Sequence, residues 1–195
     1  MKVEYAEKKT EWRKIYLINK FFQKSDKILD LGCGPGEYGP ILKKKCKLLW
    51  GVDADKKLLK IAKSRGYNKL ICKKIGDKLP FKTKEFDCIW CSEFLEHLPN
   101  LEIIDELERI TKKAIVITLP NPISPHFKLD KTHVLKYSVG GLRNFFRKRK
   151  GWRYKVRGIG FEYIPIHSFL RHLTTYLTWY FPNISPTIAV IGTSK

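Results

Sequence analysis

Long apolar runs are missing from this chain. No stretch of its 195 residues approaches the ~20 consecutive apolar residues that a membrane-spanning helix needs. The N-terminus is charged and lacks the apolar segment of a secretory signal peptide, so we expect a cytoplasmic protein. Repeats and low-complexity tracts are also missing, and the 43% hydrophobic content excludes a disordered chain. The length predicts a single domain over residues 1–195 with a substantial core.

Cysteines are few and scattered. The five cysteines make an odd set at positions 33, 46, 72, 88 and 91, which does not indicate a disulfide framework. Cys88 and Cys91 have C-x-x-C spacing, but residues three apart on a strand point to opposite faces of the sheet. We therefore expect neither a metal site nor a redox pair at these two cysteines.

A glycine is also missing from what would otherwise be a dinucleotide-binding fingerprint. Residues 28–36 read I-L-D-L-G-C-G-P-G, a hydrophobic strand followed by a carboxylate and a glycine turn. The pattern G-x-G-x-x-G, counted from Gly32, requires a glycine where Glu37 stands. Asp30 would repel a pyrophosphate but would suit a ligand that carries an ammonium group. Because glycines let the backbone approach a ligand closely, this segment predicts a loop for a cationic, nucleotide-like cofactor.

Further motifs follow at the ends of later strands. Residues 48–53 predict a buried strand ending in Asp53, near the spacing at which α/β nucleotide folds hold ribose hydroxyls. An ionised carboxylate makes strong charge-assisted bonds to two hydroxyls, so Asp53 is the predicted ribose ligand. Residues 76–81 read G-D-K-L-P-F, and the strand at 86–92 is followed by E-F-L-E-H-L at 93–98. Residues 116–121, V-I-T-L-P-N, predict another strand and its exit.

These motifs, in this order over residues 28 to about 151, resemble the class I S-adenosylmethionine (SAM)-dependent methyltransferases. The segment at 93–98 and the loop D-K-T-H-V-L-K-Y-S at 130–138 are similar to the small-molecule, quinone and lipid branch, methyltransferase type 11. The resemblance implies an α/β, Rossmann-like, doubly wound sheet of seven strands in the order 3-2-1-4-5-7-6. It implies that the last strand is antiparallel and that helices cover both faces. The N-terminal helix would occupy residues 1–25, the cofactor-binding half 26–119 and the acceptor half 120–195.

The resemblance also implies SAM as the cofactor and S-adenosylhomocysteine as the product. Asp77, the candidate contact for the adenine amine, stands two residues closer to Leu79 than the family pattern places it. The residues expected to bind the cofactor are Asp30, Gly32, Cys33, Gly34, Tyr38, Asp53, Ala54, Asp77, Lys78 and Ser92.

The acceptor is predicted to be an O or N atom of a small or lipid-like molecule. Residues after the fourth strand do not match N-P-P-Y or P-C, which argues against methylation of a DNA base. Positioning alone supplies roughly 7–11 kcal/mol of a barrier, so a strong nucleophile needs no catalytic side chain. A hydroxyl acceptor needs a base, for which His133 and His97 are candidates. Alternatively, His133 only holds its loop by hydrogen bonds.

A metal site is a further alternative. Glu93, Glu96, His97 and His133 resemble the two-carboxylate, two-imidazole site of the small-RNA 3′-end 2′-O-methyltransferases. Mixed O and N ligands would favour Mg²⁺ or Mn²⁺ over structural zinc. Because E-x-x-E-H also occurs widely without metal, we expect no bound ion.

Acidic residues are nearly missing from the C-terminal part. The net charge is +20, and residues 111–195 carry 15 basic but only two acidic side chains. Residues 143–157 hold eight Lys and Arg and no acid, which predicts contact with RNA or an anionic membrane surface at the rim of the cofactor mouth. Solvated surface is the alternative interpretation. An RNA methyltransferase, 2′-O in type, is therefore the second functional hypothesis, and a non-catalytic SAM-fold binding protein is the third.

Helices are expected between the strands. The apolar spacing predicts an amphipathic helix at 4–23, a helix after Gly36 with Pro40 in its first turn, and one at 55–65 ended by Gly66. Asn100 is predicted to cap the next helix. Ser138 would begin a helix that stops at Gly151, and a last helix is expected at 168–180.

Overall fold

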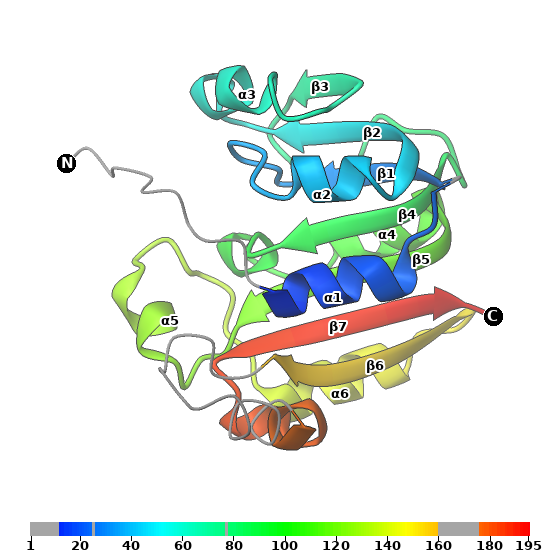
Figure 1. Cartoon of the computed structure of the whole chain (residues 1–195). Coiled ribbons are helices and arrows are strands. Elements are labelled where there is room, and N and C mark those ends of the chain that lie inside the picture. Colours follow the sequence, from blue (N-terminus) through cyan, green and yellow to red (C-terminus); the bar gives the residue numbers. More distant parts are fainter. Residues whose placement is uncertain (1–11, 25, 77, 160–175) are drawn as a thin grey trace.

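Seven strands form one mixed sheet in the computed structural model, which describes residues 12–24, 26–76, 78–159 and 176–195 (Figure 1). The order is β3-β2-β1-β4-β5-β7-β6, with β7 antiparallel to both neighbours and the other pairs parallel. The predicted fold class is therefore confirmed. The strands are β1 (Asp26–Leu31), β2 (Cys46–Asp53), β3 (Lys69–Cys72), β4 (Phe86–Ser92), β5 (Thr111–Pro120), β6 (Trp152–Ile159) and β7 (Thr187–Ser194).

The register places the carboxyl ends of the parallel strands along one edge. Ser92 at the end of β4 lies opposite Thr118, and Pro120 at the end of β5 lies opposite Thr187. Thr187 in turn lies opposite Ile159, the last residue of β6. We call this side of the sheet the carboxyl edge and the opposite side the amino edge. Ligands of open α/β sheets bind beyond the carboxyl ends of the strands.

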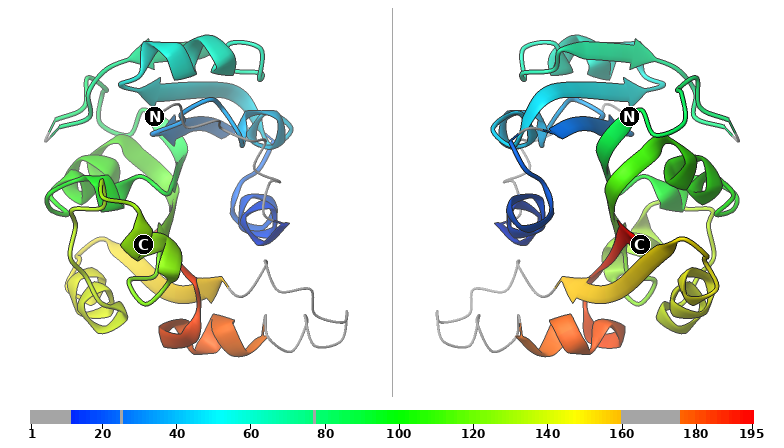
Figure 2. Two further views of the ribbon diagram at one scale, coloured as in Figure 1. Left: turned by 90° about the vertical axis from the view of Figure 1, so that its left-hand side faces the viewer. Right: turned by 90° about the vertical axis from the view of Figure 1, so that its right-hand side faces the viewer.

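Helices cover both faces of the sheet, as expected. α4 and α6 lie on one face, and α1 and α2 lie on the other (Figure 2). The helices are α1 (Trp12–Phe21), α2 (Gly39–Lys43), α3 (Lys56–Ala62), α4 (Ile103–Ile110), α5 (Pro125–Leu129) and α6 (Val139–Arg147), with 3₁₀ turns η1 (Leu95–His97) and η2 (Pro182–Ile184). Residues 176–180 are also helical. Among the residues described, none of these helices is long and apolar enough to cross a bilayer.

The core divides into one cluster on each face of the sheet. The larger cluster holds Cys91, Leu107 and Phe146, whereas the smaller one holds Cys88 and Trp90 with the inner residues of α1. The two cysteines thus point to opposite faces, and both thiols are buried and reduced. The prediction that Cys88 and Cys91 point to opposite faces of the sheet is confirmed.

Helix boundaries differ from the predictions in several places. Asn100 does not cap α4, because Glu102 is the N-cap and the Asn100 side-chain oxygen accepts the Glu102 N–H at 3.0 Å. α3 ends before its predicted limit in a turn that reaches Gly66, whose φ is +91°. α6 begins after Ser138 as predicted and ends at Arg147, before Gly151. Pro40 lies in the first turn of α2 as expected. Residues 4–11 and 168–175 lie outside the described residues.

The basic segment 143–157 does not face the cofactor mouth. Trp152 at the start of β6 lies opposite Ser194, and Thr193 lies opposite Ala114 near the start of β5. The end of α6 and the first half of β6 therefore lie at the amino edge. The prediction was wrong because a helix that connects two parallel strands returns the chain to the edge where strands begin. Only the end of the segment, near Arg157, approaches the carboxyl edge.

Candidate functional site

The glycine loop joins the ends of β1 and β2. The N–H groups of Gly32 and Cys33 both donate to the Val52 carbonyl, at 2.9 and 3.0 Å. Gly32 has φ +71°, and a Cβ there would lie 2.4 Å from the ring of Phe94. A Cβ at Gly34 would meet nothing within 4 Å. Gly32 is therefore required by packing, whereas open space lies above Gly34, where a ligand fits.

Asp53 lies beside this open space. Its Oδ2 accepts the Gly34 N–H at 2.8 Å, and its Oδ1 accepts the Asp55 N–H at 2.9 Å. A carboxylate offers about four acceptor positions, so two remain for hydroxyl groups. Ala54, the next predicted contact, is exposed. This arrangement fits the ribose-binding role predicted for Asp53.

Asp30 lies beneath the loop and is buried. Its Oδ2 accepts a hydrogen bond of 2.5 Å from the Tyr67 hydroxyl. Burial raises the pKa of Asp30 to about 7. The hydrogen bond from Tyr67 lowers this pKa, and the nearby charge of Asp53 raises it. Tyr67 could not be predicted as a partner of Asp30, because nothing in its spacing along the chain connects the two residues. A ligand ammonium would favour the charged form of this carboxyl group.

The other predicted cofactor residues occupy varied positions. Tyr38 is the N-cap residue of α2, and its buried ring lies 5.2 Å from the Trp90 ring. Burial raises the pKa of the Cys33 thiol, which keeps it protonated. Ser92 shares a 2.8 Å hydrogen bond with Thr118 at the carboxyl edge. Lys78 is exposed, and Asp77 lies outside the described residues.

Glu93 follows β4 with a left-handed backbone, φ +49°. Its Oε1 accepts a hydrogen bond from Thr118 at 3.0 Å and lies 3.0 Å from Nζ of Lys14. Lys14 reaches this position from α1 and is itself buried. Lys14 was not among the predicted site residues, since a lysine on a helix is usually solvated. Its ion pair engages Glu93, one of the four predicted metal ligands.

Glu96, His97 and His133 come together at the same edge. One ligand atom from each residue lies within 4.8 Å of the others. The His133 Nδ1 lies 3.0 Å from the Phe127 carbonyl, which only accepts, so Nδ1 carries the proton. The Nδ1 of His97 also carries the proton, because it lies 3.3 Å from the Thr132 carbonyl. No hydrogen bond to either Nε2 is found among the described residues, and the Nε2 of His133 lies 3.6 Å from Oδ2 of Asp130.

Glu96 completes this cluster as a buried acid. Its Oε2 has no hydrogen-bond partner among the described residues. Burial, followed by the nearby charge of Glu93, raises the pKa of Glu96 to about 9. One carboxylate oxygen and two imidazole nitrogens would suit a divalent cation of mixed O and N preference. Three of the four predicted ligands thus come together.

The loop at 130–138 fastens onto the carboxyl edge beside this cluster. The N–H groups of Val134 and Leu135 donate to the Glu96 carbonyl at 2.9 and 3.1 Å. The Tyr137 hydroxyl donates to the Pro120 carbonyl. His133 is therefore held next to Glu96 by backbone bonds on its C-terminal side.

Comparison with known proteins gives the same picture. Residues 29–117 match the methyltransferase domain family. Over 143 residues the chain is 32% identical to the uncharacterized protein MJ1252 of Methanocaldococcus jannaschii, covering 72% of this chain and 54% of that protein. It is 31% identical over 90 residues to a ubiquinone biosynthesis O-methyltransferase of Coxiella burnetii, covering 44% and 38%. The chain thus spans about half the length of these curated relatives or less.

Solved structures share the fold. A SAM-dependent methyltransferase from Archaeoglobus fulgidus superposes with a TM-score of 0.66 at 20% identity, covering 93% of this chain and 92% of that one. The superposition covers nearly the whole chain, including most of the residues that follow the matched domain. Residues 29–117 thus belong to the methyltransferase domain family, and the chain has the fold of the class I SAM-dependent methyltransferases.

Proposed function

We propose that this protein transfers a methyl group from SAM to an O or N atom of a small or lipid-like molecule. The observation that carries the proposal is the open position at Gly34, where Asp53 accepts the Gly34 N–H and lies near the buried Asp30, neither carboxyl group having a cationic partner among the described residues. When bound, SAM supplies a methyl group activated by its sulfonium. Asp53 accepts ribose hydroxyls, and Asp30 pairs with the ammonium group of the methionine part.

His133 is the proposed base for a hydroxyl acceptor. Its Nδ1–H bond to Phe127 leaves Nε2, which lies 3.6 Å from Oδ2 of Asp130, to take the acceptor proton as the acceptor oxygen binds the methyl carbon, the carbon–sulfur bond breaks and S-adenosylhomocysteine leaves. His97 has the same tautomer and lies with its ring centroid 5.0 Å from that of His133. The two rings together orient a hydroxyl group. An amine acceptor that is already deprotonated needs only positioning.

A small or lipid-like acceptor is favoured over RNA by the location of charge. The basic segment lies mainly at the amino edge, away from Gly34 and His133. The similarity to a ubiquinone biosynthesis O-methyltransferase supports an oxygen acceptor. A non-catalytic binding protein is disfavoured because His97 and His133 come together with Glu96 at the carboxyl edge, where the glycine loop also follows its strand.

Calorimetry with SAM and S-adenosylhomocysteine tests the cofactor assignment. Asp53→Ala removes two charge-assisted hydrogen bonds, each worth about 1.5–3 kcal/mol, so affinity for both ligands should fall at least tenfold. Asp105→Ala is the matched control, because it removes an exposed carboxylate on α4. Heat from wild type that Asp53→Ala fully retains would contradict the role of Asp53, and absence of heat from wild type would contradict the cofactor.

The acceptor is found by labelled methyl transfer. Wild-type protein and isotopically labelled SAM are incubated with separate water-soluble, lipid and RNA fractions of native cell extract, and products are identified by mass spectrometry. Label in a small or lipid-like product supports the proposal. Label confined to RNA contradicts it.

A further inference from the structure

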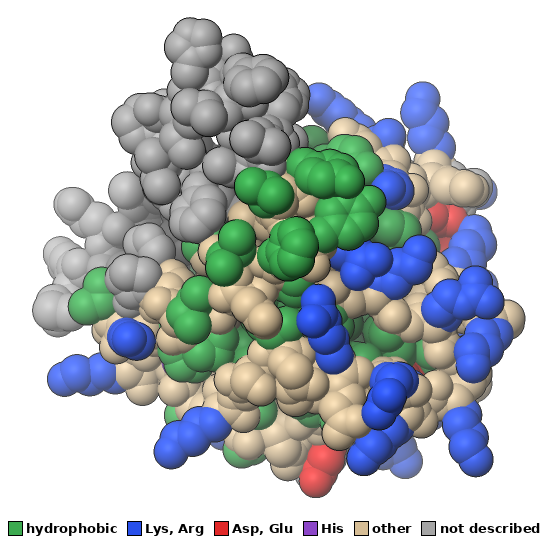
Figure 3. All heavy atoms as spheres, turned by 90° about the horizontal axis from the view of Figure 1, so that it is seen from below, with side chains coloured by type: hydrophobic (Ala, Val, Ile, Leu, Met, Phe, Trp, Pro, Cys, Tyr) green, Lys and Arg blue, Asp and Glu red, His purple; other side chains and the backbone are tan. Residues whose placement is uncertain are grey.

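The helix at 176–180 and the turn after it display a row of large apolar side chains to solvent. Three of these side chains lie on the helix at i, i+1 and i+4 and two lie in the turn that follows, and between 38% and 62% of each is exposed. Soluble monomers rarely expose a contiguous apolar patch of this kind. Figure 3 shows apolar side chains gathered on this face of the molecule. We call this row the apolar ridge, which consists of Tyr176, Leu177, Tyr180, Phe181 and Ile184.

The opposite side of the helix fixes it to the sheet. Thr178 is fully buried, and its carbonyl lies so close to Gly158 that a Cβ there would be 2.1 Å away. The Trp179 ring lies under the Arg157 guanidinium at 5.8 Å and the Lys20 ammonium at 5.7 Å. A well-anchored helix thus presents its apolar side outward, the reverse of an ordinary surface helix.

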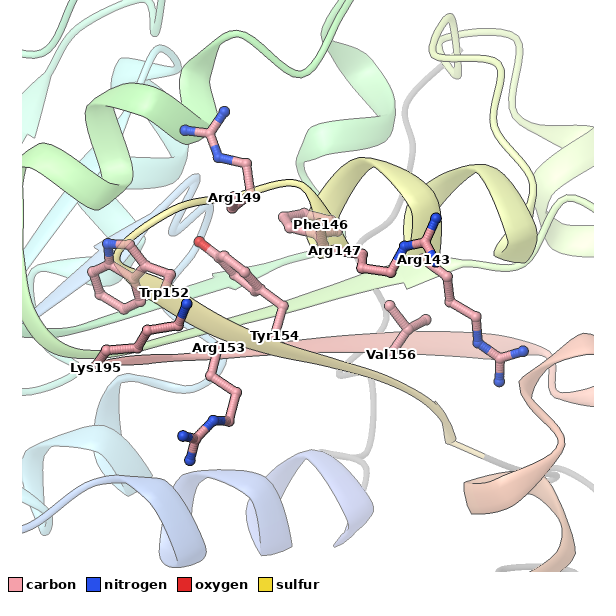
Figure 4. Close-up of a pocket in the computed structure, with 9 residues that line it drawn as sticks. All are labelled: Arg143, Phe146, Arg147, Arg149, Trp152, Arg153, Tyr154, Val156 and Lys195. Atoms are coloured by element: carbon pink, nitrogen blue, oxygen red, sulfur yellow. The ribbon is translucent and has the colours of Figure 1, made fainter.

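Cations lie along the edge strand β6, and the ridge helix contacts the C-terminal end of the same strand at Gly158. A cavity of about 280 Å³ lies between α6 and β6, with Phe146 and Tyr154 among its lining (Figure 4). Arg143, Arg153 and Lys195 also line it, and they have no acidic partner among the residues described. In Figure 4, Arg143 extends from α6 past Val156. The following residue, Arg157, contacts the ridge helix, so cavity and ridge share one strand.

We propose that this side of the molecule docks on a bilayer containing anionic phospholipids. The apolar ridge enters the interfacial region, where tyrosine rings and aliphatic chains are stabilised, while the arginines contact lipid phosphates. RNA fits less well, because Leu177 and Ile184 offer neither a stacking face nor a charge. The benefit of docking rests on the proposed function. Because β6 ends at the carboxyl edge, docking would bring a lipid-like acceptor to the side where His133 lies.

Vesicle co-sedimentation of the full chain tests this proposal. Vesicles of phosphatidylcholine alone are compared with vesicles that also contain phosphatidylglycerol. We expect sedimentation with the anionic vesicles only. Arg143→Ala and Arg153→Ala should each weaken it about fivefold, since one basic residue near an anionic surface is worth about 1 kcal/mol. Lys60→Ala, which removes an exposed cation on α3, is the matched control and should leave sedimentation unchanged.

The ridge is tested by Phe181→Ser combined with Ile184→Ser. Both side chains are exposed, so circular dichroism should be unchanged while vesicle binding falls more than tenfold. Equal binding by this variant and wild type would overturn the proposal. The proposal would also be overturned if the protein bound single-stranded RNA and the arginine variants, but not the double serine variant, lost this binding. A dimer in solution that the double serine variant dissociates would overturn it too.

SAM binding, measured separately by calorimetry, keeps the two proposals distinguishable. Vesicle binding without SAM binding would contradict the proposed function and support the docking surface. SAM binding without vesicle binding would support the cofactor assignment and contradict the docking surface.

Discussion

Acidic side chains at the two edges of the sheet have opposite surroundings. At the amino edge, Asp26 is buried but accepts a 2.6 Å bond from the Lys113 ammonium. Arg109 bonds to Glu106 at 2.7 Å and lowers the pKa of that acid. At the carboxyl edge, the Tyr67 hydroxyl is the only side-chain group among the described residues that bonds to Asp30, and burial raises the pKa of Asp30. Acids are thus paired with cations where the sheet begins, whereas at its other end Glu93 pairs with Lys14 but Asp30 and Glu96 have no cationic partner among the described residues.

The difference separates stability from function. An acid with a hydrogen-bonded cation contributes to the free energy of folding, whereas a buried acid without one opposes it. A buried acid that lowers the stability of the fold is retained where it binds a ligand or takes part in a reaction. Strongly shifted pKa values therefore occur mostly at functional sites. Glu96, whose Oε2 has no partner among the described residues, extends the pattern from the cofactor loop to the proposed acceptor cluster.

The largest expected effect is the loss of cofactor binding in Gly34→Val. The valine side chain would fill the open space above the loop, which its Cβ enters without meeting any atom within 4 Å. Calorimetry should detect no heat with SAM, although circular dichroism should match wild type. Because Gly34 has φ +50°, some destabilisation is expected from the backbone alone. Collapse of the spectrum would mean that this glycine serves the fold and not the ligand.

Loss of the proposed base is the next largest effect. His133→Gln should lower kcat by about two to four powers of ten for a hydroxyl acceptor, with SAM affinity unchanged. His97→Gln is the comparison. If both variants lose activity equally and added Mn²⁺ restores neither, while chelation inactivates wild type, the cluster binds a metal and His133 is not a simple base. Full activity of His133→Gln would remove it from the chemistry.

Asp30→Asn should stabilise the protein at about pH 8. The folded pKa of about 7 lies above the unfolded value of about 3.9, so wild-type stability falls as the pH rises through 7. A pKa raised this far corresponds to about 4 kcal/mol, which the uncharged variant avoids. Thermal unfolding should show the gain at about pH 8 and none at about pH 3. The same variant should bind SAM more weakly, and a stabilised variant with full affinity would show that Asp30 does not meet the ammonium.

The arrangement of the carboxyl edge could be predicted because it depends on strand order. Asp30, Asp53 and Ser92 each stand at the end of a predicted parallel strand, and such ends meet at one edge of the sheet. The grouping of His97 with His133 came instead from the resemblance to metal-dependent methyltransferases, and the two rings do lie together. Strand periodicity also predicted that Cys88 and Cys91 would separate.

Side-chain partners could not be predicted in this way. Tyr67 reaches Asp30, and Lys14 reaches Glu93, through packing of segments whose sequence spacing is arbitrary. Composition located the basic segment 143–157 in the sequence but did not predict at which edge of the sheet it lies. The path of the chain would have corrected that prediction, because a segment that ends a helix and begins a parallel strand lies at the amino edge.

The smallest expected effect comes from the other end of β1. Asp26→Asn keeps the shape of the side chain but removes the charge that accepts bonds from the Lys113 ammonium and, at 2.8 Å, from the Gln23 N–H. Hydrogen bonds to charged groups contribute about 1.5–3 kcal/mol, and Lys113 is half exposed, so we expect a loss of about 2 kcal/mol. Denaturant unfolding at about pH 8 measures this change in the free energy of unfolding and compares it with the change in Asp30→Asn. The same substitution, made at two positions of one strand, should thus change stability in opposite directions, and SAM affinity should change only at Asp30. If both variants shift stability the same way, the division between paired and unpaired edges does not govern this fold.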